Sequence, residues 1–116
     1  MMFQERRIYP RIPCKVNAEL ETPDGRLLDV ELVNISRSGF YVQGGEDLAD
    51  LQPPEGLGAT EIWLHFGLET SALHCHCRIT YKRRNAHDSI GLGLHIVSTD
   101  DVALNTIEHY VSARLH

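Results

Sequence analysis

The sequence predicts a mainly β protein: a six-stranded antiparallel β-barrel with one C-terminal α-helix. Apolar residues alternate with polar ones in six short segments, and an apolar spacing of three and four residues follows at the end of the chain. With 116 residues, 42% hydrophobic and 23% charged, the chain has a globular composition and the length for a single core. These observations exclude a disordered or fibrous protein.

The first 14 residues are expected to form a flexible N-terminal arm. Pro10 and Pro13 lack backbone N–H donors and push the residues before them toward extended conformations. Residues 15–116 are then expected to form the barrel domain with its helix. The sequence has no internal repeat and gives no sign of a second domain.

Each strand is expected to place every second side chain in the core, because successive side chains of a strand point to opposite faces. A TPDG turn at 22–25 follows the first strand, and a polar linker over residues 44–59 follows the third. The expected core positions are Val16, Ala18 and Leu20; Leu28, Val30 and Leu32; Phe40 and Val42; Ile62, Leu64 and Phe66; Leu73, Cys75, Cys77, Ile79 and Tyr81; and Ile90, Leu92, Leu94 and Ile96.

The helix is expected over about residues 99–115. Ser98 or Thr99 is the expected N-cap, with Asp100 and Asp101 in the first turn, where negative charge is favourable. One helix of this kind closes an open end or side of the barrel. The stripe expected to pack against it is Leu104, Ile107, Val111 and Leu115.

The charge distribution argues against a DNA- or RNA-binding protein. The net charge is −5, yet the first 15 residues carry four cations and one acid. A cationic arm on an acidic body suits a compact anion. No apolar run approaches the ~20 residues of a membrane helix, so no membrane insertion is expected. The three cysteines fit a reduced, cytoplasmic location.

Two segments contain residue types suited to binding an anion or a base edge. The first is RRIYPR at 6–11, whose guanidinium groups match phosphate oxygens and the O6 and N7 atoms of guanine. The second is NISRSG at 34–39, which offers an amide, a hydroxyl and a glycine that permits positive φ. Each has a simpler interpretation by itself, as a solvated tail and as a hairpin turn.

Together the two segments resemble the PilZ domain family, which is marked by an RxxxR motif in the arm and a [D/N]xSxxG motif after the second strand. Here the motifs are RIYPR at 7–11 and NISRSG at 34–39, with 22 residues between them. The following strands, with GLGL at 91–94, and the terminal helix extend the resemblance over essentially the whole chain.

The resemblance implies a PilZ-like barrel of the split-barrel type that binds the bacterial second messenger cyclic di-GMP. It implies that Arg7 and Arg11 bind phosphates and guanines, with Asn34, Ser36 and Gly39 on the opposite side of the ligand. The family more often has Asp at the first place of the second motif. An amide is a weaker acceptor than a carboxylate, so Asn34 is expected to lower the affinity.

The resemblance also bears on stoichiometry and partners. In such domains a cation directly before the first motif, here Arg6, accompanies a stacked pair of ligand molecules, so one or two molecules per domain are expected. No other cofactor is implied. A single domain of this kind signals through an effector protein, and motility, biofilm formation and polysaccharide export are the processes that the family suggests.

Two other functions stay open at this point. The first is an interaction adaptor with the same fold that binds no nucleotide. The second is a metal-binding module built on HCHC at 74–77, although on a strand its histidines and cysteines point to opposite faces and cannot converge on one ion. No metal ligand and no catalytic residue are assigned, and the chain is not expected to be an enzyme.

Overall fold

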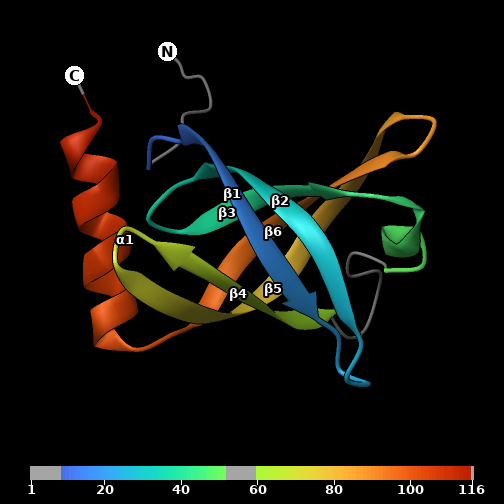
Figure 1. Cartoon of the computed structure of the whole chain (residues 1–116), viewed down its shortest axis with the longest axis horizontal. Helices are drawn as coiled ribbons and strands as arrows, with labels where there is room; N and C mark the ends of the chain where they lie inside the picture. Colours follow the sequence, from blue (N-terminus) through green and yellow to red (C-terminus); the bar gives the residue numbers. More distant parts are fainter. Residues whose placement is uncertain (1–8, 52–59, 116) are drawn as a thin grey trace, which may run out of the picture.

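The six alternating segments form one closed barrel, as the sequence predicts. The computed structural model describes residues 9–51 and 60–115. Neighbouring strands are antiparallel and follow the order β1-β2-β3-β6-β5-β4, with β4 paired to β1 (Figure 1). The elements are β1 (Ile12–Glu21), β2 (Leu27–Ile35), β3 (Gly39–Gly44), the 3-10 helix η1 (Glu46–Leu48), β4 (Glu61–Leu68), β5 (Ser71–Ala86), β6 (Ser89–Ser98) and α1 (Asp101–Ala113).

The barrel interior is filled by the alternating apolar side chains. Full burial of one such side chain contributes about 1.5–3 kcal/mol to stability. Phe40 of β3 meets Phe66 of β4 edge to face with ring centroids 5.3 Å apart, which joins two strands that are not neighbours in the barrel. Side chains with no exposed surface come from all six strands: Leu20, Leu32, Val42, Leu64, Cys75, Ile79 and Leu92.

The turn between β1 and β2 forms where the TPDG signal predicts it. The Gly25 N–H donates to the carbonyl of Thr22 at 2.9 Å, and Gly25 has φ of 91°, a conformation that glycine adopts without a steric cost. The Thr22 hydroxyl accepts from the Arg26 N–H at 3.0 Å and fixes the other side of the turn.

β1 begins earlier than expected. Its first residue is Ile12, inside the segment 1–14 that was expected to be an arm, and it includes Pro13. The pairing with β2 shifts register between Pro13 and Val16, so the proline lies at a bulge, where its missing N–H is tolerated. This early start places the residue before the strand, Arg11, at the mouth of the barrel.

A second bulge corrects one expected core residue. Tyr81 was expected in the core beside Ile79, but the pairing of β5 with β6 shifts register between these two residues. The bulge turns Tyr81 to the outer face, where its ring lies over Gly93. Two-residue periodicity cannot show such a shift, because one extra residue reverses the alternation beyond it.

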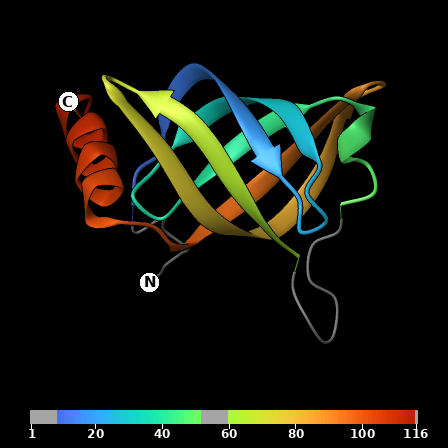
Figure 2. The same cartoon turned by 60° about the horizontal axis from the view of Figure 1, so that its bottom comes forward.

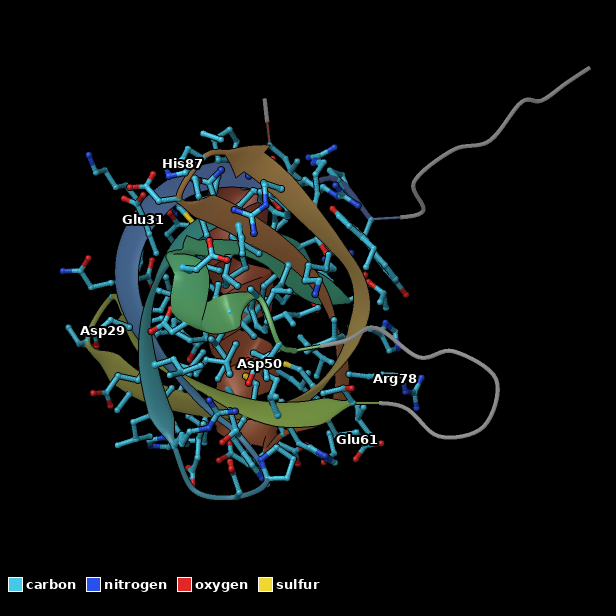
Figure 3. The ribbon with its side chains drawn as sticks, turned by 90° about the vertical axis from the view of Figure 1, so that its right-hand side faces the viewer. Asp29, Glu31, Asp50, Glu61, Arg78 and His87 are labelled. Carbon is cyan, nitrogen blue, oxygen red and sulfur yellow. The ribbon has the colours of Figure 1, made fainter. Side chains whose placement is uncertain are left out.

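The two ends of the barrel are covered differently (Figure 2). The 44–59 segment was expected to be only a polar linker, yet its described part includes η1 and buries Leu48 and Leu51. Figure 3 looks along the barrel with η1 in front, α1 behind and Asp50 near the centre. It also shows Asp29 and Glu31 of β2 on the outside of the barrel. The alternate residues Leu28, Val30 and Leu32 are buried.

Helix α1 covers the opposite end of the barrel, and its buried face includes Ala103 in place of the expected Leu104. Its N-cap is Asp100 rather than Ser98 or Thr99: the Asp100 carboxylate accepts from the Ala103 N–H at 2.7 Å. The buried residues are Ala103, Ile107 and Val111, whereas Leu104 is 42% exposed. Ala103 lies four residues before Ile107 and Leu104 lies three residues before it, so both spacings fit an apolar stripe, and packing against the barrel selects Ala103.

Candidate ligand-binding site

The pairing of β1 with β2 brings the end of the first motif to the second motif. Ile12 lies opposite Ile35 and Pro13 lies opposite Asn34. Arg11, one residue before β1, therefore lies next to Ser36, one residue after β2. The start of β1, the turn between β2 and β3, and α1 are at the same end of the barrel (Figure 1). Arg11 is exposed there, whereas the predicted site residues Arg6 and Arg7 lie outside the described residues.

Ser36 holds the turn between β2 and β3 together. Its hydroxyl oxygen accepts from the backbone N–H groups of Ser38 and Gly39, both at 3.2 Å, and its own N–H donates to the Gly39 carbonyl at 2.9 Å. Only 6% of Ser36 is exposed. The hydroxyl is thus used by the turn itself, and Ser36 shapes the site rather than offering a free polar group.

Gly39 is required by close packing and not by its backbone conformation. A Cβ atom at this position would lie 2.0 Å from the carbonyl oxygen of Leu94 on β6. The only described glycine with positive φ is Gly25, so the sequence-based argument for positive φ at Gly39 is wrong. The glycine lets β3 approach β6 where the turn enters the barrel.

Asn34 is the first residue of a row of register partners that runs across the outer surface of four strands. It is half-buried and lies opposite Tyr41 of β3, which lies opposite Gly93 of β6, which lies opposite Tyr81 of β5. Strands are about 4.8 Å apart, so the three steps from Asn34 to Tyr81 span about 14 Å. The Tyr41 and Tyr81 rings stack at 6.1 Å with an interplanar angle of 22°.

The glycines of β6 form the floor beneath the two tyrosines. A Cβ atom at Gly91 would lie 1.9 Å from the Tyr41 hydroxyl oxygen, and one at Gly93 would lie 2.1 Å from Cε1 of Tyr81. The GLGL sequence at 91–94 therefore alternates a buried leucine with a glycine that admits an aromatic ring on the outer face.

Arg83 adds a cation above this floor. Its guanidinium carbon lies 5.6 Å from the centre of the Tyr41 ring, and Asn85 Nδ2 donates to the Tyr41 hydroxyl at 2.8 Å. Burial by itself raises the pKa of Tyr41, but the hydrogen bonds from Asn85 and Arg83 and the charge of Arg83 outweigh it and hold the pKa below its usual value. From the sequence alone, Arg83 suits a solvated hairpin tip or a basic contact with a partner. The bulge before Tyr81, which brings Arg83 to this row, gives no signal in the two-residue pattern.

Arg37, a variable position of the second motif, joins the turn to α1. Its Nη2 atom donates to the Ser112 hydroxyl at 3.3 Å and lies 3.6 Å from a carboxylate oxygen of Glu108. The β2–β3 turn and the C-terminal helix are thus in direct contact. Sequence spacing gave no signal of this contact, because the residues are 75 positions apart.

The His-Cys segment of β5 has the orientation that argued against a four-ligand metal site. Cys75 and Cys77 have no exposed surface, whereas His74 and His76 face outward. Burial raises the pKa of both thiols, which disfavours the thiolate form that binds metal. Among residues 9–51 and 60–115, no group of three or more His, Cys, Asp or Glu side chains is placed to hold a metal ion.

The helices in the described part of the chain were compared with the requirements for crossing a membrane. None of its helices has both the length and the apolar character that a membrane crossing needs.

Comparison with known proteins identifies the family. The model of the PilZ domain matches residues 5–113. The chain is similar in structure to the Escherichia coli PilZ domain of YcgR solved with c-di-GMP, at a TM-score of 0.69 and 12% identity, covering 94% of this chain and 91% of that one. The PilZ domain of CeSA from a cellulose-synthesizing bacterium aligns at a TM-score of 0.58 and 19% identity over 92% and 99% of the two chains.

A longer protein shares the same fold. The Bacillus subtilis inhibitor of motility, MotI/DgrA, aligns at a TM-score of 0.72 and 12% identity, and the match covers 96% of this chain. This chain spans about half of that protein, 52% of its length. A search of curated protein sequences finds no significant match. The family match over nearly the whole length, with the barrel and its terminal helix, shows that the chain belongs to the PilZ domain family.

Proposed function

We propose that this domain is a non-catalytic receptor that binds cyclic di-GMP on the outer face of β2, β3 and β6 at the α1 end of the barrel. The observation that carries the proposal is the β1–β2 register, which sets Arg11 beside the Asn34–Gly39 turn. Arg11 and a polar turn are then neighbours, and a ligand with two phosphates and two guanines requires both a cation and polar groups.

Each motif residue has a proposed role. Arg7 and Arg11 bind phosphate and guanine edges in pairs of charge-assisted hydrogen bonds. Asn34 faces a guanine edge from the opposite side. Ser36 and Gly39 support the turn, which agrees with the hydrogen bonds of the Ser36 hydroxyl and the close approach of Gly39 to β6. The residues that we propose to contact the ligand are Arg6, Arg7, Arg11 and Asn34, and Ser36 and Gly39 complete the site by shaping the turn.

The tyrosine row extends this site along the barrel. Arg83 lies over the Tyr41 ring, and Tyr81 is only partly buried. We include Arg83 as a further phosphate- or guanine-binding cation, because its planar group can stack on a base while its N–H groups bind an anion. A second ligand molecule, if Arg6 supports one, would lie toward this row.

Signalling is proposed to pass through α1. Arg37 contacts Ser112 and Glu108, so a ligand that draws the turn or the arm inward changes the helix contacts. An effector protein that reads the helix would detect this difference. The neighbour MotI/DgrA is named an inhibitor of motility, which makes a motility protein the first partner to test. The three free cysteines agree with a reducing, cytoplasmic compartment.

Calorimetric titration with cyclic di-GMP tests the proposal. We expect saturable binding to the wild type with one or two equivalents and no measurable binding to Arg11→Ala. A micromolar dissociation constant corresponds to about −8 kcal/mol. The matched control is Arg26→Ala in the β1–β2 turn, where the Arg26 side chain lies beside Asp24 and Asp50, at the end of the barrel that η1 covers. Absence of binding to the wild type would instead favour an interaction adaptor that binds no nucleotide.

A further inference from the structure

Two histidines from neighbouring strands meet on the outer face of β4 and β5. His65 and His74 are direct partners in the strand register, and their Nδ1 atoms are 2.8 Å apart. The other ring nitrogen of His65, Nε2, lies 2.8 Å from a carboxylate oxygen of Glu21 on β1. This cluster lies on β1, β4 and the first half of β5, away from the β2–β3 turn.

The hydrogen bonds determine which nitrogen of His65 carries the proton. An ionised carboxylate only accepts, so Nε2 of His65 is the donor to Glu21. The neutral His65 ring then has a lone pair on Nδ1, directed at His74. In the metal-free protein the Nδ1–H of His74 donates to this lone pair. A lone pair fixed in direction by a carboxylate on the far side of the ring is the arrangement found for histidines that bind metal ions.

Packing holds the His65 ring in place. The Trp63 indole lies parallel to it, with ring centroids 6.5 Å apart and an interplanar angle of 4°. Trp63 also stacks on His76 at 5.1 Å. The Thr99 hydroxyl donates to the backbone carbonyl of His74 at 3.0 Å and ties the other strand to the end of β6. The His65 ring and the backbone of His74 are therefore positioned before any ligand arrives, which lowers the entropy cost of binding.

We propose that His65 and His74 bind one late first-row divalent metal ion, such as Zn²⁺, through their Nδ1 atoms. Zinc–nitrogen bonds are about 2.0–2.1 Å, and a tetrahedral angle between two such bonds places the nitrogens about 3.3–3.4 Å apart. The observed 2.8 Å separation has to open by about 0.5 Å, and both rings have to turn so that their Nδ1 lone pairs point at the ion instead of at each other. The proton on Nδ1 of His74 moves to its Nε2 atom through solvent.

This site differs from the HCHC hypothesis and from a closed structural zinc site. It uses one histidine of that segment, and its second ligand comes from the adjacent strand. Two protein ligands leave the other coordination positions to water, since His74 is exposed. Glu21 acts only by orienting His65, because its carboxylate is on the Nε2 side of the ring.

The single tryptophan of the chain gives a direct readout. Ni²⁺ is added to the full-length protein, prepared without a histidine tag, and quenching of Trp63 fluorescence is followed. Zn²⁺ binding is measured separately by calorimetry and by competition with Ni²⁺. We expect saturation at one equivalent, and at least a tenfold loss of affinity in His65→Ala and in His74→Ala. Glu21→Gln keeps both ligands and is expected to lose affinity about tenfold.

His76→Gln is the matched control. His76 lies on the same face, two residues from His74, and its Nε2 atom is 2.7 Å from Glu61, but the residue opposite it is Trp63 rather than a second histidine. Because His76 stacks on Trp63, this change can alter the fluorescence of the free protein, so the comparison uses the Zn²⁺ affinity from calorimetry, which should equal that of the wild type. Melting curves first show that His65→Ala and His74→Ala are folded. If these two variants then bind the metal like the wild type, or if His76→Gln loses as much metal affinity as they do, the metal is an adventitious ion only. Either result overturns the proposal.

Discussion

The barrel presents two different outer faces. The face on β2, β3 and β6 lies over glycines and has Arg11, Asn34 and the stacked tyrosines around it. The face on β1, β4 and β5 instead brings together Glu21, His65 and His74. The first face is marked by contiguous motifs, whereas the second exists only because three strands are adjacent. Local motifs therefore draw attention to only one of the two faces.

The largest expected effect separates the two faces. Arg11→Ala should lower cyclic di-GMP affinity at least 100-fold, because charge-assisted pairs to phosphate and guanine are lost, while Ni²⁺ quenching of Trp63 stays as in the wild type. His65→Ala should show the reverse pattern. Both are measured by paired titrations of each variant with each ligand. Loss of both activities in a folded single variant would contradict the independence of the faces.

Gly39→Ala should be the most destabilising single change on the motif face. Its Cβ would meet a backbone carbonyl at 2.0 Å, which cannot move aside without shifting β6, so a loss of about 3 kcal/mol in the free energy of unfolding is expected. Gly45→Ala is the control, since the nearest atom to its Cβ is 3.8 Å away. Chemical denaturation of both variants measures the difference, and equal stability would remove the packing argument.

Ser36→Ala should have a smaller effect on stability. The change leaves the N–H groups of Ser38 and Gly39 without their side-chain acceptor, which is expected to cost about 1–2 kcal/mol. Ser38→Ala keeps that acceptor and should be close to neutral. If Ser36→Ala instead abolishes ligand binding at unchanged stability, its hydroxyl contacts the ligand and the supporting role is wrong.

The smallest expected effect concerns the pair that joins η1 to the β5–β6 hairpin. Hydrogen bonds from Arg84, at 3.0 Å, and its positive charge hold the pKa of Glu46 below the usual value. Because the folded-state pKa is the lower one, this stabilisation is present above the usual glutamate pKa and is lost as pH falls through the folded value. Glu46→Gln should therefore melt slightly below the wild type at pH 7 and equally at pH 2. A difference that persists at pH 2 would show another cause.

The barrel and most of its core follow from the sequence because strand alternation is a local property. Each of the six predicted strands forms, and the residues at alternate positions are buried. The pattern failed at Tyr81, where a bulge reverses the alternation, and at Leu48, an apolar residue in a segment without periodicity. It also misplaced the helix cap by one or two residues, since Ser98, Thr99 and Asp100 all suit that role.

By itself, the sequence determined the fold class, the two motifs, and the outward direction of His65 and His74, because these depend on residues close together in the chain. The tertiary structure decided which residues meet. It set Arg11 beside Ser36, turned Tyr81 onto Tyr41, and put His65 opposite His74. Register and bulges fix such pairs, and both are set by packing across strands, which no single stretch of sequence contains.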